Sequence, residues 1–205
     1  VSLPEGAAII LHCIPIMTFE SSSQVNIPTA SDDIRRLRTI EAEHNLLFRH
    51  NLDGIVTYFN TSIGYSSYCQ LYRNGILEAV DVSILLEDQE IGKVIRGQYL
   101  EHQLAEFCEK NIPLQRELGV NGPIYLLLSL VSVKGYRMVP KQNHYSGHAE
   151  TKIDRDHLLL PEIMIDERDN VDWYRILHPL FDMLWNATGW PKCMDYDENG
   201  TWNPN

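Results

Sequence analysis

Long apolar runs and short polar turns divide the chain into strand-like and helix-like segments. Residues 7–16 and 124–133 are nearly continuous apolar runs, a pattern typical of strands that are buried on both faces. Pro15 should lie at the end of the first strand, because proline cannot donate a hydrogen bond to the ladder. We expect a helix on one side of the 124–133 strand and more protein on the other.

Two pairs of turn residues predict β-hairpins. Asp53-Gly54 interrupts the strand-like pattern of residues 46–59, and Asn74-Gly75 separates the strand-like runs 68–73 and 76–82. Asp-Gly and Asn-Gly are the preferred pairs in two-residue hairpin loops of type I′. The sequence therefore predicts one hairpin at each pair.

A two-residue loop at the second pair would also fix the register of that hairpin. Arg73 would lie opposite Ile76, and Leu71 opposite Glu78. Arg73 and Glu78 would then be diagonal neighbours on one face of the hairpin, close enough for a modest ion pair.

The hydrophobic period changes to that of a helix in two segments. Residues 98–118 carry one apolar stripe, with most charged side chains outside it. Pro113 should kink or divide this helix. A second helix is expected to begin after Asp169 or Asn170 as its N-cap and to end at Gly189.

These elements predict an α+β fold with a mixed, mainly antiparallel sheet, hairpins and two principal helices. A further strand is expected over residues 158–165 despite Pro161, and the partly aromatic tail 190–205 should pack against the domain. With 205 residues and 44% apolar content, one domain spanning residues 1–205 is the expected organisation.

The charge balance argues against one class of function. Seventeen basic and 28 acidic residues give a net charge of −11. Nucleic-acid binding relies on clustered Lys and Arg, so we expect no direct nucleic-acid contact by this segment. No apolar run approaches the ~20 residues that span a bilayer, and no signal peptide is recognisable. We therefore expect no membrane association and a cytoplasmic location.

The four cysteines show no metal-binding or disulfide spacing. They contain no CxxC pair, and each lies in or beside an apolar stretch; they are Cys13, Cys69, Cys108 and Cys193. Because this pattern differs from that of small disulfide-rich secreted domains, we expect buried free thiols.

One candidate metal site lies in a polar segment. His144 and His148 are four residues apart, and Asp154, Asp156 and His157 follow. Imidazole and carboxylate groups can ligate zinc or another first-row transition metal. The surrounding residues predict a loop, however, and polar loops collect such residues without binding a metal.

A set of carboxylates near strand ends suggests a second possibility, a metal-dependent nuclease or phosphohydrolase. Its members are Asp53, Glu78, Asp81, Glu162 and Asp166. The Glu-x-Lys of a common nuclease fold is absent, and most of these acids fit turns or solvated strand faces. Glycine-rich phosphate loops and G-x-S-x-G are absent as well, so we expect no cofactor.

A third candidate is a pocket for a nucleotide or another small ligand, lined by the hairpin tyrosines. Its polar residues are difficult to explain by packing within strands and turns alone. They are Arg73, Glu78, Asp53 and His12, and Glu78 would orient Arg73.

Several segments together carry a resemblance to a known family. They are AIILHCIP (8–15), NLDG (51–54), QLYRNGILEAV (70–80), VKGYRM (133–138), DRDHLLLPE (154–162) and NATGWP (186–191). Together they resemble the C-terminal region of bacterial proteins that begin with a Schlafen/Alba-type DNA-binding domain, which are often described as ATP-binding. The resemblance covers nearly the whole chain, but its motifs mark a sequence family and not a known reaction.

The resemblance implies that DNA or ATP binding belongs to an upstream N-terminal domain. The chain begins with Val-Ser, and we expect it to be the C-terminal domain of a longer protein. No catalytic residue is transferred. The favoured function is therefore a non-catalytic sensing, docking or oligomerisation domain, in phage defence or regulation. Its expected partners are the upstream domain and further copies of itself, while the nuclease and ligand-binding alternatives stay open.

Overall fold

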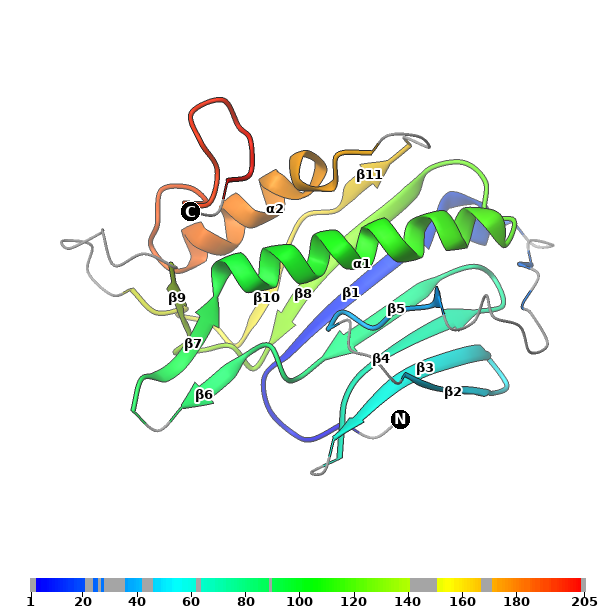
Figure 1. The fold of residues 1–205 in the computed structure, drawn as a ribbon, viewed down its shortest axis with the longest axis horizontal. Coiled ribbons are helices and arrows are strands. Elements are labelled where there is room, and N and C mark those ends of the chain that lie inside the picture. The colour runs from blue at the N-terminus through cyan, green and yellow to red at the C-terminus, as the bar shows by residue number, and fades with distance from the viewer. Residues whose placement is uncertain are drawn as a thin grey trace.

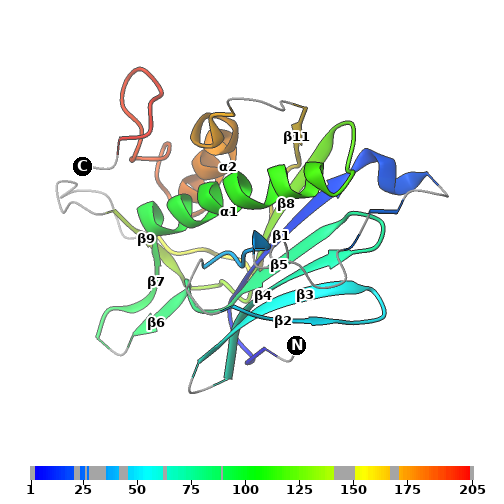
Figure 2. The ribbon, with the colours of Figure 1, turned by 45° about the vertical axis from the view of Figure 1, so that its right-hand side comes forward.

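The computed structural model describes residues 3–20, 24–25, 27, 36–41, 46–61, 64–88, 90–140, 151–166 and 171–203. Within these ranges the chain forms an eight-stranded sheet, a three-stranded sheet and two long helices (Figures 1 and 2). All pairings in the large sheet are antiparallel, and one pairing in the small sheet is parallel. The predicted α+β fold with a mainly antiparallel sheet is confirmed.

The large sheet is ordered β10-β8-β1-β5-β4-β3-β2, and β11 also pairs with β8. Its strands are β1 (Ala8–Pro15), β2 (Leu47–His50), β3 (Gly54–Thr61), β4 (Gly64–Tyr72), β5 (Leu77–Asp81), β8 (Ile124–Val131), β10 (His157–Leu159) and β11 (Ile163–Ile165). Pro15 ends β1, as predicted. The strand expected over residues 158–165 is divided into β10 and β11.

The small sheet was not predicted from the sequence. It is ordered β6-β7-β9, with β6 at Leu86–Asp88, β7 at Gly92–Arg96 and β9 at Arg137–Val139. A short 3-10 helix, η1 (Ile16–Phe19), follows β1. Strand β7 leads directly into the first long helix.

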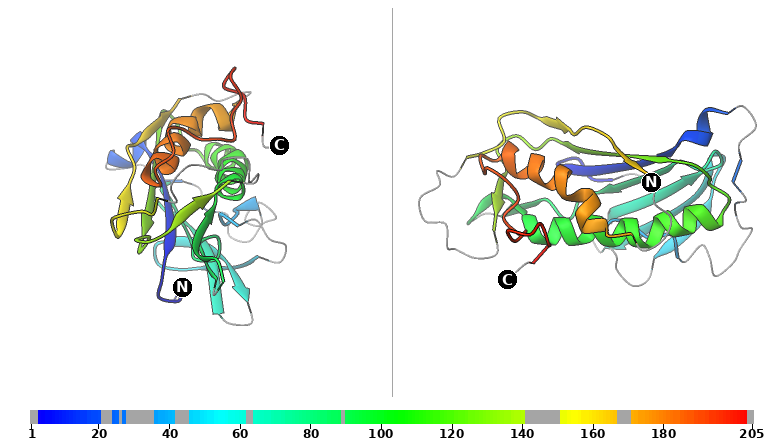
Figure 3. Two further views of the ribbon diagram at one scale, coloured as in Figure 1. Left: turned by 90° about the vertical axis from the view of Figure 1, so that its left-hand side faces the viewer. Right: turned by 90° about the horizontal axis from the view of Figure 1, so that it is seen from above.

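Both long helices lie on the same side of the large sheet (Figure 3). They are α1 (Gly97–Glu117) and α2 (Trp173–Ala187), and their apolar residues join the inward side chains of the strands in one core. Pro113 lies inside α1 and does not divide it. No helix of the described chain is long and apolar enough to cross a membrane.

The second helix begins later than predicted. Its N-cap is Asp172, whose carboxylate accepts a hydrogen bond from the backbone N–H of Arg175 at 3.1 Å. Asp169 and Asn170 lie outside the described residues. The helix starts where its buried stripe starts, at Trp173, because tertiary burial and not the first available capping residue sets the boundary. Gly189, with φ +84°, follows its C-terminus as expected.

Burial alternates along the two central strands β1 and β8. The burial of β8 alternates strictly along Ile124–Val131, and that of β1 alternates from Ile9 onward. Burial on both faces, expected from the apolar runs, is therefore wrong for this chain as described. The reason is that α1 and α2 cover one face, and no helix of the described residues covers the other.

Both hairpins are present, but the register of the second differs from the prediction. Leu71 pairs with Leu77, and Tyr72 N–H donates to the Ile76 carbonyl at 2.8 Å. The loop therefore has three residues and ends at Gly75, which alone adopts a left-handed φ of +90°. A turn followed by one left-handed residue is the usual three-residue loop. The one-residue shift transfers Glu78 to the opposite face.

The remaining predictions about packing are confirmed. All four cysteines are free and buried. The tail also packs against the domain, because the indole of Trp202 stacks on Tyr174 with ring centroids 4.0 Å apart.

Candidate functional site

The face of the large sheet opposite the helices carries an unusual set of side chains, which we call the open face. The strand registers place on it Ile10, His12, Ile14, Leu47, Arg49, Val56, Tyr58, Tyr68, Gln70, Tyr72, Glu78, Val80, Tyr125, Leu127, Ser129, Val131, His157, Leu159 and Met164. Most are apolar or aromatic. The exposure of the open face is uneven: Leu159, Met164 and Leu47 on the outer strands are 75%, 55% and 50% exposed. Val56, Gln70 and Val80, nearer the middle, are buried.

Among the open-face residues that the structure describes, only Arg49 and Glu78 carry a full charge, so these residues have a formal net charge of zero with the histidines neutral. Antiparallel sheets with one solvated face normally place polar residues there. The open face departs from that pattern in charge and in apolar content.

A polar cluster occupies the centre of the open face. Strand β1 lies beside β5, and the Nε2 of His12 lies 3.2 Å from Oε2 of Glu78. The hydroxyl of Tyr68, on β4, donates to the other carboxylate oxygen at 2.8 Å. The hydrogen bond with His12 lowers the pKa of Glu78, which therefore stays ionised. Burial, followed by the contact with Glu78, raises the pKa of Tyr68.

The structure divides the four residues of the predicted ligand site into two pairs. His12 and Glu78 meet on the open face, but Arg73 lies in the hairpin loop. Its Nε donates to the Leu52 carbonyl at 3.0 Å, and its backbone N–H donates to the Asp53 carbonyl at 2.9 Å. The predicted ion pair between Arg73 and Glu78 is wrong, because the predicted register was one residue out.

The carboxylates predicted for a nuclease do not gather at one point. Glu78 and Asp81 are three residues apart on β5 and face opposite sides of the sheet. Asp81 accepts hydrogen bonds from the backbone N–H groups of Ser83 and Ile84 at 2.8 and 2.9 Å. Burial raises the pKa of Asp81 to about 6. Two metal ions ~4 Å apart need shared carboxylates, and this pair cannot supply them.

The predicted metal ligands His144 and His148 lie outside the described residues. Another cluster escaped the sequence prediction. Ligand atoms of Glu101, Cys193 and Asp195, all buried, lie within 4.8 Å of one another.

Hydrogen bonds from the protein already engage the carboxylate of this cluster. The indoles of Trp185 and Trp202 each donate to Glu101 at 2.8 Å, one to each oxygen, and the Cys193 thiol donates at 3.1 Å. The charged side chains of this helix were mostly expected outside its buried stripe, yet Glu101 is only 1% exposed. The arrangement fastens the tail and α2 to α1. The spacing of apolar residues along the helix gave no indication that Glu101 would be buried.

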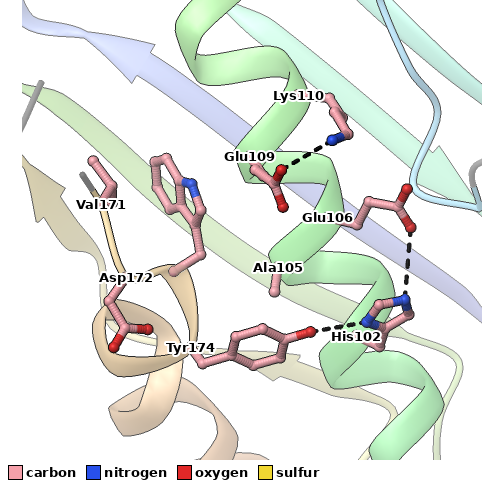
Figure 4. A pocket seen from close by; sticks show the side chains of 9 residues that line it. His102, Ala105, Glu106, Glu109, Lys110, Val171, Asp172 and Tyr174 are labelled. Carbon is pink, nitrogen blue, oxygen red and sulfur yellow. Dashed lines mark hydrogen bonds and ion pairs between the residues drawn. The ribbon is translucent and has the colours of Figure 1, made fainter. Parts of the chain in front are cut away.

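A cavity of about 340 Å³ lies between α1 and the start of α2 (Figure 4). Within it, Nδ1 of His102 lies 2.8 Å from the Tyr174 hydroxyl, and Nε2 lies 3.8 Å from the Glu106 carboxylate. This chain of groups resembles an acid–base relay. However, burial and the charges of Glu109 and Glu106 raise the pKa of Tyr174, which is the wrong direction for a phenolate base.

Comparison with known proteins yields no match to a family model, a curated protein or a solved structure.

Proposed function

We propose that this chain is a non-catalytic oligomerisation domain, in which two copies pack their open faces against each other. One observation carries the proposal. The central strands β1 and β8 have apolar side chains on both faces, and the helices cover only one of them. The sequence pattern calls for protein on both sides, and a second copy supplies the missing layer.

The composition of the open face fits a protein interface. The cores of interfaces are depleted of charge and enriched in aromatic residues and Met. Tyr58, Tyr68, Tyr72 and Tyr125 lie on this face, and Met164 lies at its edge. Large exposed apolar patches on a soluble domain mark interaction sites.

Charge favours a second copy as the occupant. The chain carries a net charge of −11, so most of its surfaces repel another copy. The open face is neutral, because Arg49 and Glu78 balance. It can therefore meet the same face of a second copy without like-charge repulsion, in a twofold arrangement in which each contact occurs twice.

The dimensions also suit a stable dimer. The seven strands from β10 to β2 have about 6 residues on average. Six spacings of ~4.8 Å and ~3.3 Å per residue then give a face of roughly 600 Å². Standard interfaces begin at about 600 Å² per partner. Two such faces would pack ~10 Å apart, as the layers of a β-sandwich do.

The cluster of His12, Glu78 and Tyr68 would lie at the middle of this interface. Within one copy, Nε2 of His12 and both carboxylate oxygens of Glu78 already have partners, so burial between two copies leaves the carboxylate paired. A polar centre in an apolar interface favours one alignment of the two sheets over sliding alternatives.

The wider setting rests on the resemblance to Schlafen/Alba-type bacterial proteins. On that basis we propose that the domain follows an upstream DNA-binding domain in a cytoplasmic protein of phage defence or regulation. A dimer of this domain would bring two DNA-binding domains together, and the acidic segment itself would not contact nucleic acid.

The solution mass tests the proposal. We expect the chain to sediment at twice its monomer mass, and the variant Leu47→Glu/Met164→Glu to sediment as a monomer, with a dissociation constant raised at least about 100-fold. Both side chains are at least half exposed in one copy, so the variant should fold. The matched control is Phe19→Glu/Leu52→Glu, which adds the same charge at exposed apolar positions outside the open face.

Three outcomes would overturn the proposal. The wild-type chain could be monomeric at about 100 µM, a concentration at which dimers of this size form. The control variant could dissociate as readily as the open-face variant. The face could instead bind an upstream domain added in trans, in which case the occupant is that domain and not a second copy.

A further inference from the structure

A second docking site can be derived from the edge of the large sheet at β10. This strand is the last in the sheet, and its one described neighbour is β8. Leu158 faces Leu130, and the N–H of Leu160 donates to the Leu128 carbonyl at 3.1 Å. Hydrogen-bonded positions alternate along an antiparallel pair. The N–H and C=O groups of His157 and Leu159 therefore point away from β8.

A groove of about 510 Å³ runs along this edge. One wall is β10 with Leu160, and the other is the C-terminal half of α2, which contributes Met183, Asn186 and Ala187. Gly189 allows the walls to approach, because a Cβ there would lie 2.6 Å from the side chain of Thr151. The groove thus joins free strand hydrogen-bonding groups to an apolar helix surface.

The charged residues of the groove differ in sign from the chain as a whole. They are Lys152, Asp154 and Arg155, with a net charge of +1, whereas the chain carries −11. Asp154 and Arg155 neutralise each other at 3.0 Å. Within the described ranges Lys152 has no ion-pair partner, so its ammonium group is available to a ligand.

We propose that this groove binds an extended acidic segment of a partner protein as an added strand. The segment's backbone would pair with His157 and Leu159. Alternate side chains would point toward α2 and the solvent, so that apolar residues contact Met183 and Ala187. A carboxylate of the segment would pair with Lys152. Strand addition of this kind combines backbone hydrogen bonds for affinity with side-chain pockets for specificity.

This site can be tested apart from the proposed dimer. His157 and Leu159 belong to both sites, but the groove uses their outward backbone groups whereas the dimer uses their side chains. Lys152 and the α2 wall lie outside the open face, and Leu47 and Met164, which are altered in the dimer test, do not line the groove. A monomeric chain would still present the groove. Failure of one proposal therefore leaves the other to be decided by its own measurement.

Fluorescence anisotropy with labelled peptides tests the inference. The probe is a pool of octapeptides with Asp or Glu at even positions and Val, Leu or Phe at odd positions. We expect saturable binding below about 1 mM. Lys152→Glu should weaken it at least about tenfold, because it replaces attraction by repulsion. Lys192→Glu, an exposed lysine that does not line the groove, is the matched control.

Two substitutions of one residue test the backbone contact. Leu159→Pro removes the outward N–H and keeps the pairing with β8, whereas Leu159→Ala keeps both. The proline variant should lose at least about tenfold in affinity, and the alanine variant less than about threefold. The inference is overturned if the pool shows no saturable binding, if the same pool with Lys at the even positions binds equally well, or if the two variants behave alike.

Discussion

The carboxylate of Glu78 lies 3.2 Å from the imidazole of His12, although 66 residues separate them in the chain. The contact exists because β1 and β5, distant in sequence, are neighbours in the sheet. It places one ionised side chain at the centre of an apolar face. The contribution of this His12–Glu78 contact to the free energy of unfolding can be measured as a function of pH.

The pair makes stability depend on pH in the acid range. The pKa of Glu78 is lowered from 4.5 by the hydrogen bond with His12. The stabilisation is therefore present above pH 4.5 and is lost as the pH falls through the folded-state pKa. We expect Glu78→Gln to show a smaller loss of unfolding free energy below about pH 4.5 than the wild type. Urea unfolding at several pH values, monitored by tryptophan fluorescence, measures this loss of unfolding free energy. Glu162→Gln, an exposed control, should follow the wild type; equal slopes for all three proteins would contradict the prediction.

Ionisation of Asp81 should change the free energy of unfolding with pH in the opposite direction. Burial raises its pKa from 3.8 to about 6. Its ionisation therefore destabilises the fold as the pH rises from 3.8 through 6. Asp81→Asn keeps an oxygen that accepts from Ser83 and Ile84 and removes the charge. We expect its unfolding free energy at pH 7 to exceed that of the wild type by about 1–2 kcal/mol, with little difference near pH 3. Asp81→Ala, which loses the acceptor, should be destabilised at both pH values. A lower stability of Asp81→Asn at pH 7 would refute this assignment.

The tail is fastened through a hydrogen bond to a buried acid. Trp202→Phe removes the donor to Glu101 and keeps an aromatic ring over Tyr174. We expect a loss of about 1–2 kcal/mol in the free energy of unfolding. Trp202→Leu, which also loses the stacking, should cost a further ~0.5–1.5 kcal/mol. If the phenylalanine variant unfolds at the same urea concentration as the wild type, the hydrogen bond contributes nothing.

At Gly97, replacing glycine by alanine should lower the free energy of unfolding, although this change normally stabilises a helix. Alanine in place of glycine gains up to about 1 kcal/mol in a helix. Here the new Cβ would lie 2.7 Å from Cζ2 of the buried Trp185. Overpacking of this kind costs about 1–3 kcal/mol, so we expect Gly97→Ala to be destabilising. In a Trp185→Leu background the clash with the indole is removed and only Sδ of Met138, 3.1 Å away, stays close, so the same substitution should cost less. A double-mutant cycle of thermal unfolding measures the difference.

Local residue patterns predicted most elements. The apolar runs located β1 and β8, the periodic stripe located α1, and two turn pairs located two hairpins. These features depend on neighbours in the chain, so they can be recognised without tertiary information. The short strands β6, β7 and β9 escaped prediction because each is at most five residues long, and because the parallel pairing of β7 with β9 joins segments far apart in the chain.

The candidate site was only half predicted. His12 and Glu78 were identified as polar residues in strands, and the fold brings them together. Arg73 was assigned to the same site because Asn74-Gly75 resembles a two-residue loop. The actual loop has three residues, since only Gly75 takes a left-handed conformation. A difference of one residue reverses the faces of a strand, and the sequence does not specify it.

The sequence by itself determined that the central strands have two apolar faces. Side-chain direction alternates with a period of two along any strand, so a continuous apolar run places apolar side chains on both faces. Only the tertiary structure decided which of those faces the helices cover and which is left open, because helix placement depends on contacts between segments far apart in the chain. The same is true of Glu101. Its position on α1 indicates an exposed acid, and only the packing of Trp185 and Trp202 against it makes burial favourable.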